Sequence, residues 1–263
     1  MVSLAAIALI VGVALLAPII APYSPTEQFR DSILQPPSAR FWLGTDQLGR
    51  DVLTRIVFGA QTSLVIALAT TMIGGAIGIA AGVVSGWAGR GVDLVVQRIS
   101  DAIESIPPIV LLLLMAAILG PSIPNTILAL MIIQLPGFNR VARGETIRLK
   151  QERYIEASRS VGAGSIRLVL RHILPNMFGP IMTVATLRFA SVIIAESALS
   201  FLGLGPPPPT PSWGAMISSG VQYLASAPWL IVFPAVALAL SVLAFNLLGD
   251  SLRDYLDPRL TAR

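Results

Sequence analysis

The chain has 263 residues, of which 54% are hydrophobic and 12% are charged, with a net charge of +4 and a mean hydropathy of +0.77. An average soluble domain is about a quarter charged, so this composition indicates a protein that crosses a membrane several times. The basic residues cluster between apolar segments, as topology signals do, and do not favour nucleic-acid binding.

The residue types also argue against catalysis by this chain. It has no cysteine, which excludes disulfides, iron–sulfur clusters and thiolate metal sites. His172 is the single histidine, and neither a phosphate-binding G-x-x-x-x-G-K-[ST] loop nor an H-E-x-x-H pair occurs. We therefore predict no catalytic residue, no cofactor and no metal site. If ATP drives the protein, another chain must bind it.

The first apolar run, near Leu4 to Ala21, is long enough to cross about 30 Å of hydrocarbon. We assign residues 1–22 to a retained first transmembrane helix. The alternative is a cleaved signal peptide, but the run lacks a basic start and a clear A-x-A cleavage site. The absence of arginines before the run suggests that a further stretch precedes this sequence.

Residues 23–61 are expected to form an external segment that contains an interfacial helix. Asp46 is placed to cap this helix. The apolar face of the helix would consist of Leu48, Val52, Leu53 and Ile56. Three charged side chains are expected to remain in water: Arg50, Asp51 and Arg55.

Residues 62–249 are expected to form a core domain of five further transmembrane helices, followed by a cytoplasmic tail over residues 250–263. The spans are predicted near residues 62–84, 107–119, 126–138, 178–204 and 229–248. Gly74, Gly78 and Gly82 recur every four residues, which predicts a smooth stripe where another helix approaches closely.

Basic residues fix the expected orientation. If the N-terminus is cytoplasmic, only Arg30, Arg40, Arg50 and Arg55 lie outside, and Arg188 lies within a span. All of the other Lys and Arg residues then lie in the cytoplasm, in agreement with the positive-inside rule. Both termini and the polar stretch 150–176 are therefore predicted to be cytoplasmic.

Residues 150–176 are too charged to enter a bilayer and form the main polar interruption of the chain. Tyr154, Ile155, Ala157, Ser158 and Val161 recur at helical spacing and place an apolar stripe on one face of a short helix. Gly162 is expected to end this helix in a tight turn. The stripe needs a protein partner or, alternatively, a membrane surface.

The spacing of this stretch resembles a known motif. Glu156-Ala157-Ser158, then Gly162, then Leu174-Pro175 is similar to the EAA loop of permease subunits of ATP-driven (ABC) importers. Ser158 and His172 depart from the general pattern. The strings L-G-T-D-x-x-G-R-D at residues 43–51, E-S-A-L-S-F-L-G-L-G at residues 196–205 and the stretch 249–259 resemble the dipeptide and oligopeptide branch of that family.

The resemblance implies an all-α membrane protein of about six transmembrane helices with the type I ABC importer permease (MetI-like) architecture, in a bacterial cytoplasmic membrane. It implies three kinds of protein partner besides lipid, namely a second homologous permease, two ATP-binding subunits and an external substrate-binding protein. The implied cargo is a di- or oligopeptide, with nickel or another small solute as the alternative. The residues implied in coupling to the ATPases are Tyr154, Ile155, Glu156, Ala157, Ser158, Arg159, Val161, Gly162, Leu174 and Pro175.

Four polar residues in apolar segments are candidates for the translocation path: Arg188, Glu196, Gln134 and Asn246. A mid-membrane arginine costs about 2.5 kcal/mol or more, so Arg188 should face protein or water. It would either pair with a partner subunit or bind a ligand carboxylate. Buried hydrogen bonds between helices explain Gln134 and Asn246 equally well.

Two other functions compete with the permease assignment. An ion-driven secondary transporter could relay charge through Arg188 and Glu196. An intramembrane hydrolase would need a buried base, and the single histidine, His172, falls in the polar loop instead.

Overall fold

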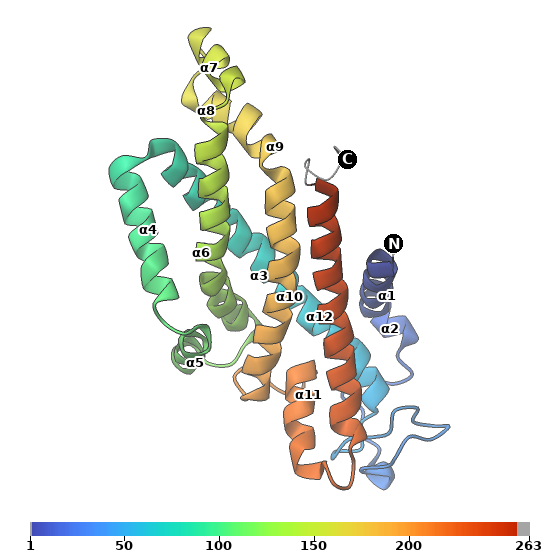
Figure 1. Ribbon diagram of the computed structural model, residues 1–263. Coiled ribbons are helices and arrows are strands. Elements are labelled where there is room, and N and C mark those ends of the chain that lie inside the picture. Colours follow the sequence, from blue (N-terminus) through green and yellow to red (C-terminus); the bar gives the residue numbers. More distant parts are fainter. Residues whose placement is uncertain (1, 257–263) are drawn as a thin grey trace. The chain divides into compact units, whose positions relative to one another are not determined.

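The computed structural model describes residues 2–256, which form helices joined by loops, with no strand among them. Two compact units can be distinguished. Unit 1 comprises residues 1–69, 109–130 and 189–247, and unit 2 comprises residues 70–108, 131–188 and 248–263. Long helices run from one unit into the other, so neither unit is a continuous stretch of chain (Figure 1).

The helical elements follow in chain order. They are α1 (Val2–Leu15), α2 (Ala17–Ile20), η1 (Arg30–Ser32), α3 (Val52–Ala88), α4 (Arg90–Glu104), α5 (Pro108–Leu119), α6 (Ile123–Leu149), α7 (Arg153–Ser160), α8 (Ser165–Leu168), η2 (Val169–Ile173), α9 (Leu174–Asn176), α10 (Phe178–Phe201), α11 (Trp213–Gly220), η3 (Val221–Tyr223) and α12 (Trp229–Leu256).

The all-α prediction is confirmed for the described residues, and the helices are apolar where spans were expected. Within residues 2–256, three helices are long and apolar enough to cross a membrane, or up to four if α4 and α5 count as one broken span. The three are α3, α10 and α12. The total of six spans therefore stays a prediction.

The first apolar run is not the single helix that we expected. Helix α1 ends at Leu15, and α2 begins at Ala17 with Pro18 in its first turn. Proline has no N–H to donate, and its ring conflicts with the carbonyl four residues earlier, here that of Ala14, which explains the interruption.

In unit 1 the predicted interfacial helix is absent, and Asp46 does not cap a helix. Its carboxylate instead accepts hydrogen bonds from the backbone N–H of Leu48 at 2.8 Å and of Arg50 at 2.9 Å. Arg50 also donates from Nε to the Asp46 carboxylate at 2.7 Å. These contacts hold residues 46–50 in a tight loop. The helix that was predicted to follow Asp46 therefore begins only at Val52.

The cap of α3 is Asp51, whose carboxylate accepts the backbone N–H of Thr54 at 2.7 Å. The expectation that Arg50, Asp51 and Arg55 stay in water is wrong, because each is less than a tenth exposed. Burial raises the pKa of the Asp51 carboxyl above its ordinary value, and the hydrogen bond from Thr54 opposes that rise. These three charged residues are thus buried within unit 1.

The loop after α10 also packs inward within unit 1. Trp213, at the start of α11, is 1% exposed and donates from Nε1 to the carbonyl of Ile56 at 3.1 Å. Trp229 donates to the carbonyl of Thr45 at 3.2 Å. Two indoles therefore tie the late part of the chain to the loop that precedes α3.

In unit 2 the glycine stripe on α3 packs directly on α6, as predicted. A Cβ added at Gly78 would lie 2.8 Å from the carbonyl oxygen of Leu135, and one at Gly86 would lie 2.9 Å from that of Arg143. Contacts this short between a side chain and a backbone do not occur in folded proteins. Only glycine allows the two backbones to approach this closely.

Three helices extend further than the predicted spans. Helix α3 covers Val52–Ala88 rather than residues 62–84, α6 continues past Phe138 to Leu149, and α12 continues past Leu248 to Leu256. The first part of the predicted 250–263 tail is therefore helical, and residues 257–263 lie outside the described part of the chain. The longer α6 matters for function because it leads directly into the polar stretch 150–176.

Candidate functional site

The polar stretch of unit 2 folds as a helix, a tight turn and a second helical segment. Helix α7 (Arg153–Ser160) ends in a turn at Gly162, whose φ of +88° lies in the left-handed region that favours glycine. The chain then continues through α8, η2 and α9 into α10, and α7 and α8 lie together beyond the end of α6 (Figure 1). The predicted helix and glycine turn are thus present.

A small hydrophobic core holds this stretch on the chain's own helices. Ile155 of α7 is 1% exposed and belongs to a buried cluster. The other buried members are Val83, Ala142, Leu149, Leu168, Ile173 and Met177. Because the cluster draws on α3, α6, α7 and the helices that follow, it seats α7 firmly within unit 2.

The outer surface of the same stretch is apolar and exposed. Val161 is 86% exposed and Ile166 is 76% exposed. Of the predicted apolar stripe, this chain itself buries Ile155 and leaves Tyr154 and Val161 exposed. Glu156, Ala157 and Arg159 are exposed beside them. Val161 and Ile166, together with Glu156 and Ala157 of the EAA-like positions, therefore form an outward surface on this stretch.

Trp87, near the end of α3, anchors the stretch by polar contacts. Lys150 donates from Nζ to the carbonyl oxygen of Trp87 at 2.6 Å. The Lys150 ammonium lies 5.3 Å from the centre of the indole ring, and the Arg159 guanidinium lies 5.6 Å from it. Two cations thus bind one aromatic ring, and one of them also satisfies a carbonyl at the end of a helix.

Lys150→Met is expected to loosen α7 without unfolding the protein. The variant loses a cation–π contact and a carbonyl partner, so amide hydrogen exchange within α7 should rise about two- to fivefold. Mass spectrometry of the exchanged protein measures this directly. Arg167→Met, which removes an exposed cation from α8, serves as the matched control. Equal exchange in both variants would show that Trp87 does not anchor the stretch.

A polar seam between α4 and α6 was missed from the sequence. Asp93 binds Arg143 through two hydrogen bonds of 2.6 Å, and Glu104 pairs with Arg140. Between these ion pairs, Asn139 donates from Nδ2 to Oγ of Ser100 at 2.9 Å. The signal was the recurrence of polar residues at positions 93, 97, 100 and 104, which is the spacing of one helix face.

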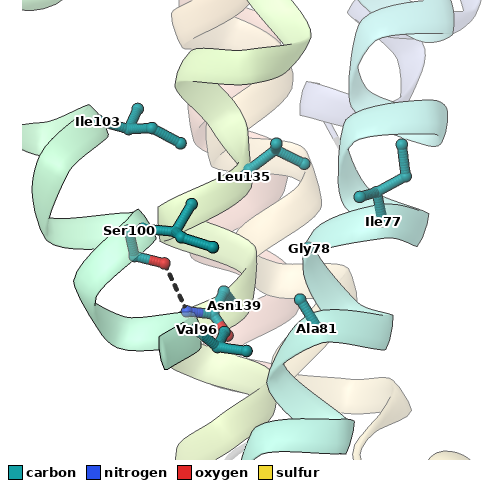
Figure 2. Close-up of a pocket in the computed structure, with 9 residues that line it drawn as sticks. Ile77, Gly78, Ala81, Val96, Ser100, Ile103, Leu135 and Asn139 are labelled. Atoms are coloured by element: carbon teal, nitrogen blue, oxygen red, sulfur yellow. Dashed lines mark hydrogen bonds between the residues drawn. The ribbon is translucent and has the colours of Figure 1, made fainter. Parts of the chain in front are cut away.

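A small cavity of about 140 Å³ lies beside this seam, bounded by α3, α4 and α6 (Figure 2). Its lining is almost wholly apolar, with Ser100 and Asn139 as the polar exceptions. Oδ1 of Asn139 is buried and has no hydrogen-bond partner in the described residues. Such an oxygen is normally satisfied by water.

Two of the predicted path residues meet in unit 2. Arg188 of α10 donates from Nη1 to Oε1 of Gln134 at 3.2 Å, and Gln134 of α6 donates from Nε2 to the carbonyl of Arg188 at 3.2 Å. Gln134 is 5% exposed, whereas Arg188 is only half-buried. The sequence identified both residues but gave no sign that they bind each other.

The other two path residues lie in unit 1. Glu196 is fully buried and accepts hydrogen bonds from Oγ of Ser200 at 2.6 Å and Oγ of Ser63 at 2.9 Å. The bond from Ser63 joins α10 to α3, whereas Ser200 lies on α10 itself. Asn246 is half-buried in α12. The enclosure of Glu196 favours a role in helix packing, and its place in a path stays a prediction.

Comparisons with known proteins agree on the family. Residues 78–262 match the model of the binding-protein-dependent transport system inner membrane component, and residues 1–37 match the N-terminal transmembrane domain of oligopeptide transport permease C. The di/tripeptide transport system permease protein DppC of Pseudomonas aeruginosa is 45% identical over 96% of this chain and 85% of the relative. The glutathione transport system permease protein GsiD of Escherichia coli is 43% identical over 96% of this chain and 84% of the relative.

A solved structure supports the fold. A chain of the MetNI methionine ABC transporter, in an inward-facing conformation, matches with a TM-score of 0.64 and 21% identity over 78% of this chain and 97% of that chain. At this identity the match speaks for the fold alone, and it confirms the expected MetI-like architecture. Together with the family match and the 45% identical relative, it leads to one conclusion. The chain belongs to the binding-protein-dependent transport system inner membrane components, a family of ABC importer permeases.

Proposed function

We propose that this protein forms half of the translocation path of an ATP-driven importer of di- and oligopeptides. The observation that carries the proposal is the stretch 150–176, which is seated on the chain's own core by Ile155 and yet presents Val161 and Ile166 to the outside. A cytoplasmic surface of this kind needs a protein partner, and an ATP-binding subunit is the partner that a permease of this family requires.

Coupling follows from how the stretch is connected. Helix α6 ends at Leu149, directly before the stretch, and α10 begins at Phe178, shortly after Asn176. When two ATPase subunits close on ATP, a docked α7 moves with them, and the core around Ile155 transmits the movement to both helices. The path then changes from inward-facing to outward-facing by a rigid-body movement. ATP hydrolysis itself takes place in the ATPase subunits.

The proposed assembly contains a second, homologous permease and an external substrate-binding protein. The exposure of α10 supports a further membrane partner. This chain buries only 17% of an apolar 18-residue stretch of α10, compared with 44% of the corresponding stretch of α3. The topology we propose keeps both termini and residues 150–176 in the cytoplasm, with the core domain 62–249 crossing the membrane. The segment 23–61 and the loop after α10 would then face the binding protein.

Peptide is favoured over nickel as the cargo. The relatives named for di/tripeptide and glutathione transport are more than 40% identical, and both kinds of solute carry carboxylates. The half-buried guanidinium of Arg188 suits an anionic group and would repel a bare divalent cation.

The test is purification of the tagged chain from detergent-solubilised membranes, with mass spectrometry of the bound chains and ATPase assays. We expect a second permease, two ATPase copies and turnover stimulated by binding protein loaded with dipeptide. Stimulation by Ni²⁺ instead would assign the protein to metal import. Transport that survives ATP depletion but stops when the ion gradient collapses would overturn the proposal in favour of a secondary transporter.

A further inference from the structure

The guanidinium of Arg188 on α10 carries a charge that no carboxylate of the described residues pairs with directly. An arginine has five N–H donors, and within residues 2–256 one of them, on Nη1, binds a side chain, that of Gln134. Among the ion pairs of residues 2–256, none includes Arg188. The side chain is half-buried rather than enclosed, so the remaining donors are available to a ligand.

The guanidinium is held in place by Gln134. The amide of Gln134 accepts from Nη1 of Arg188 and donates to the carbonyl of the same residue, both at 3.2 Å. A residue that binds both the end and the base of a side chain fixes its direction. Since Gln134 is 5% exposed, water does not compete effectively for these bonds.

Gly137 makes room for the same guanidinium on α6. A Cβ added at this glycine would collide with the nitrogens of Arg188, whose Nε would lie 2.8 Å away. The guanidinium therefore lies directly against the α6 backbone at Gly137, about one turn after Gln134. Two residues of α6 thus position a cation that α10 supplies.

The charges nearest to Arg188 do not neutralise it. Glu104 and Arg140 both act on it electrostatically, but they are paired with each other. The three groups together carry one positive charge in excess. A cation in this position needs an anion or water, and α10, which is little covered by its own chain, leaves room for either.

We propose that Arg188, positioned by Gln134 and Gly137, binds the C-terminal carboxylate of the peptide during transport. A carboxylate accepts two parallel hydrogen bonds from one guanidinium, which supplies both charge and direction. The inference rests on the proposed function, because the protein must first be shown to import peptides. It adds a site of recognition within the membrane to whatever selectivity the external binding protein provides.

The site also lies on the two helices that flank the stretch 150–176. Gln134 is on α6 and Arg188 is on α10, and unit 2 contains both residues together with α7. Movement of α7 therefore acts on both sides of the hydrogen-bonded pair. A carboxylate bound there would sense the same movement that opens the path.

The experiment compares import of one dipeptide with import of the same dipeptide amidated at its C-terminus, in proteoliposomes with saturating loaded binding protein. The maximal import rate of the free dipeptide is divided by that of the amidated dipeptide, and this ratio is measured for the native protein and for Arg188→Ala. Any preference of the binding protein enters both ratios equally and cancels, as in a double-mutant cycle. We expect Arg188→Ala to lower the ratio about ten- to hundredfold, the range for hydrogen bonds to charged groups.

Three further variants separate positioning from charge. Arg188→Lys keeps the charge but not the paired donors, and Gly137→Ala keeps the arginine but displaces it, so each should lower the ratio in part. Arg98→Ala removes an exposed cation from α4 that is outside this cluster of charges and should leave the ratio unchanged. A ratio that Arg188→Ala does not alter, with both rates falling together, would overturn the inference and assign Arg188 to pairing with another subunit. Peptide-stimulated ATPase activity in the same vesicles reports separately on the proposed function.

Discussion

Gly162→Val is expected to lower peptide import at least tenfold while the ATPase subunits continue to hydrolyse ATP. At a φ of +88° a β-branched side chain is strained by about 1–3 kcal/mol. The turn can relieve this strain only by changing the direction of α7 relative to α8. Import and ATP hydrolysis measured in the same proteoliposomes would show the loss of coupling as a rise in ATP consumed per peptide.

Gly164 provides the matched control, because it lies two residues away in the same turn. Its φ is −70°, and a Cβ at either glycine would meet nothing within 4 Å. Steric crowding is therefore excluded at both positions, and only the backbone angle differs. If Gly164→Val impaired coupling as strongly as Gly162→Val, the left-handed turn would not be the reason.

Gly82→Leu is expected to prevent α3 and α6 from packing and so to abolish folding of the permease. A Cβ at this position would lie 2.8 Å from the Ala142 side chain and 2.9 Å from the backbone nitrogen of Arg143. The rest of a leucine has no space, and the α6 backbone cannot move aside alone, so we expect a loss of about 3 kcal/mol or more. The yield of monodisperse protein in size-exclusion chromatography measures the effect.

A graded series tests this explanation. Gly74→Ala should be tolerated better than Gly82→Ala, because the nearest atom of Met131 would lie 3.2 Å from the new Cβ. Gly144→Leu on α6, where a Cβ meets nothing within 4 Å, is the control and should assemble normally. Normal yield for Gly82→Leu would mean that α3 and α6 do not pack as closely as described.

The parts of the fold that were predictable depend on local rules. Gly162 ends α7, and glycine favours a helix end wherever it occurs. The glycine repeat on α3 forms a smooth stripe that α6 packs against, and the stripe is visible from the spacing within α3 alone. The exposure of Val161 was not predictable in the same way. Periodicity places Tyr154, Ile155 and Val161 on one stripe, but the chain's own core covers only Ile155.

The segment before α3 shows where local rules fail. Asp46 and Asp51 are both good helix caps, and the sequence gives no reason to prefer the second. The choice follows from hydrogen bonds that Asp46 makes to backbone N–H groups and to Arg50 within its loop. Trp229, nearly two hundred positions later in the chain, supports the same loop through the carbonyl of Thr45. Contacts at that separation are not visible in a periodic pattern.

The candidate site was predicted as residues but not as an arrangement. Arg188 and Gln134 were each notable as polar groups in apolar runs, yet their pairing depends on how α6 meets α10. Gly137 carried no signal of its own, and its importance comes only from the guanidinium that lies over it. The polar face of α4 was present in the sequence as a regular spacing, but no helix was expected there.

The internal core of the stretch 150–176 has a consequence for how the complex is built. Ile155, Leu168 and Ile173 are buried by this chain alone, so α7 has its final shape before any other subunit arrives. An ATPase subunit then binds a surface that is already folded, and little conformational freedom is lost on binding. Assembly can therefore follow membrane insertion as a separate and reversible event, which would let a dissociated permease exchange its motor subunits without refolding.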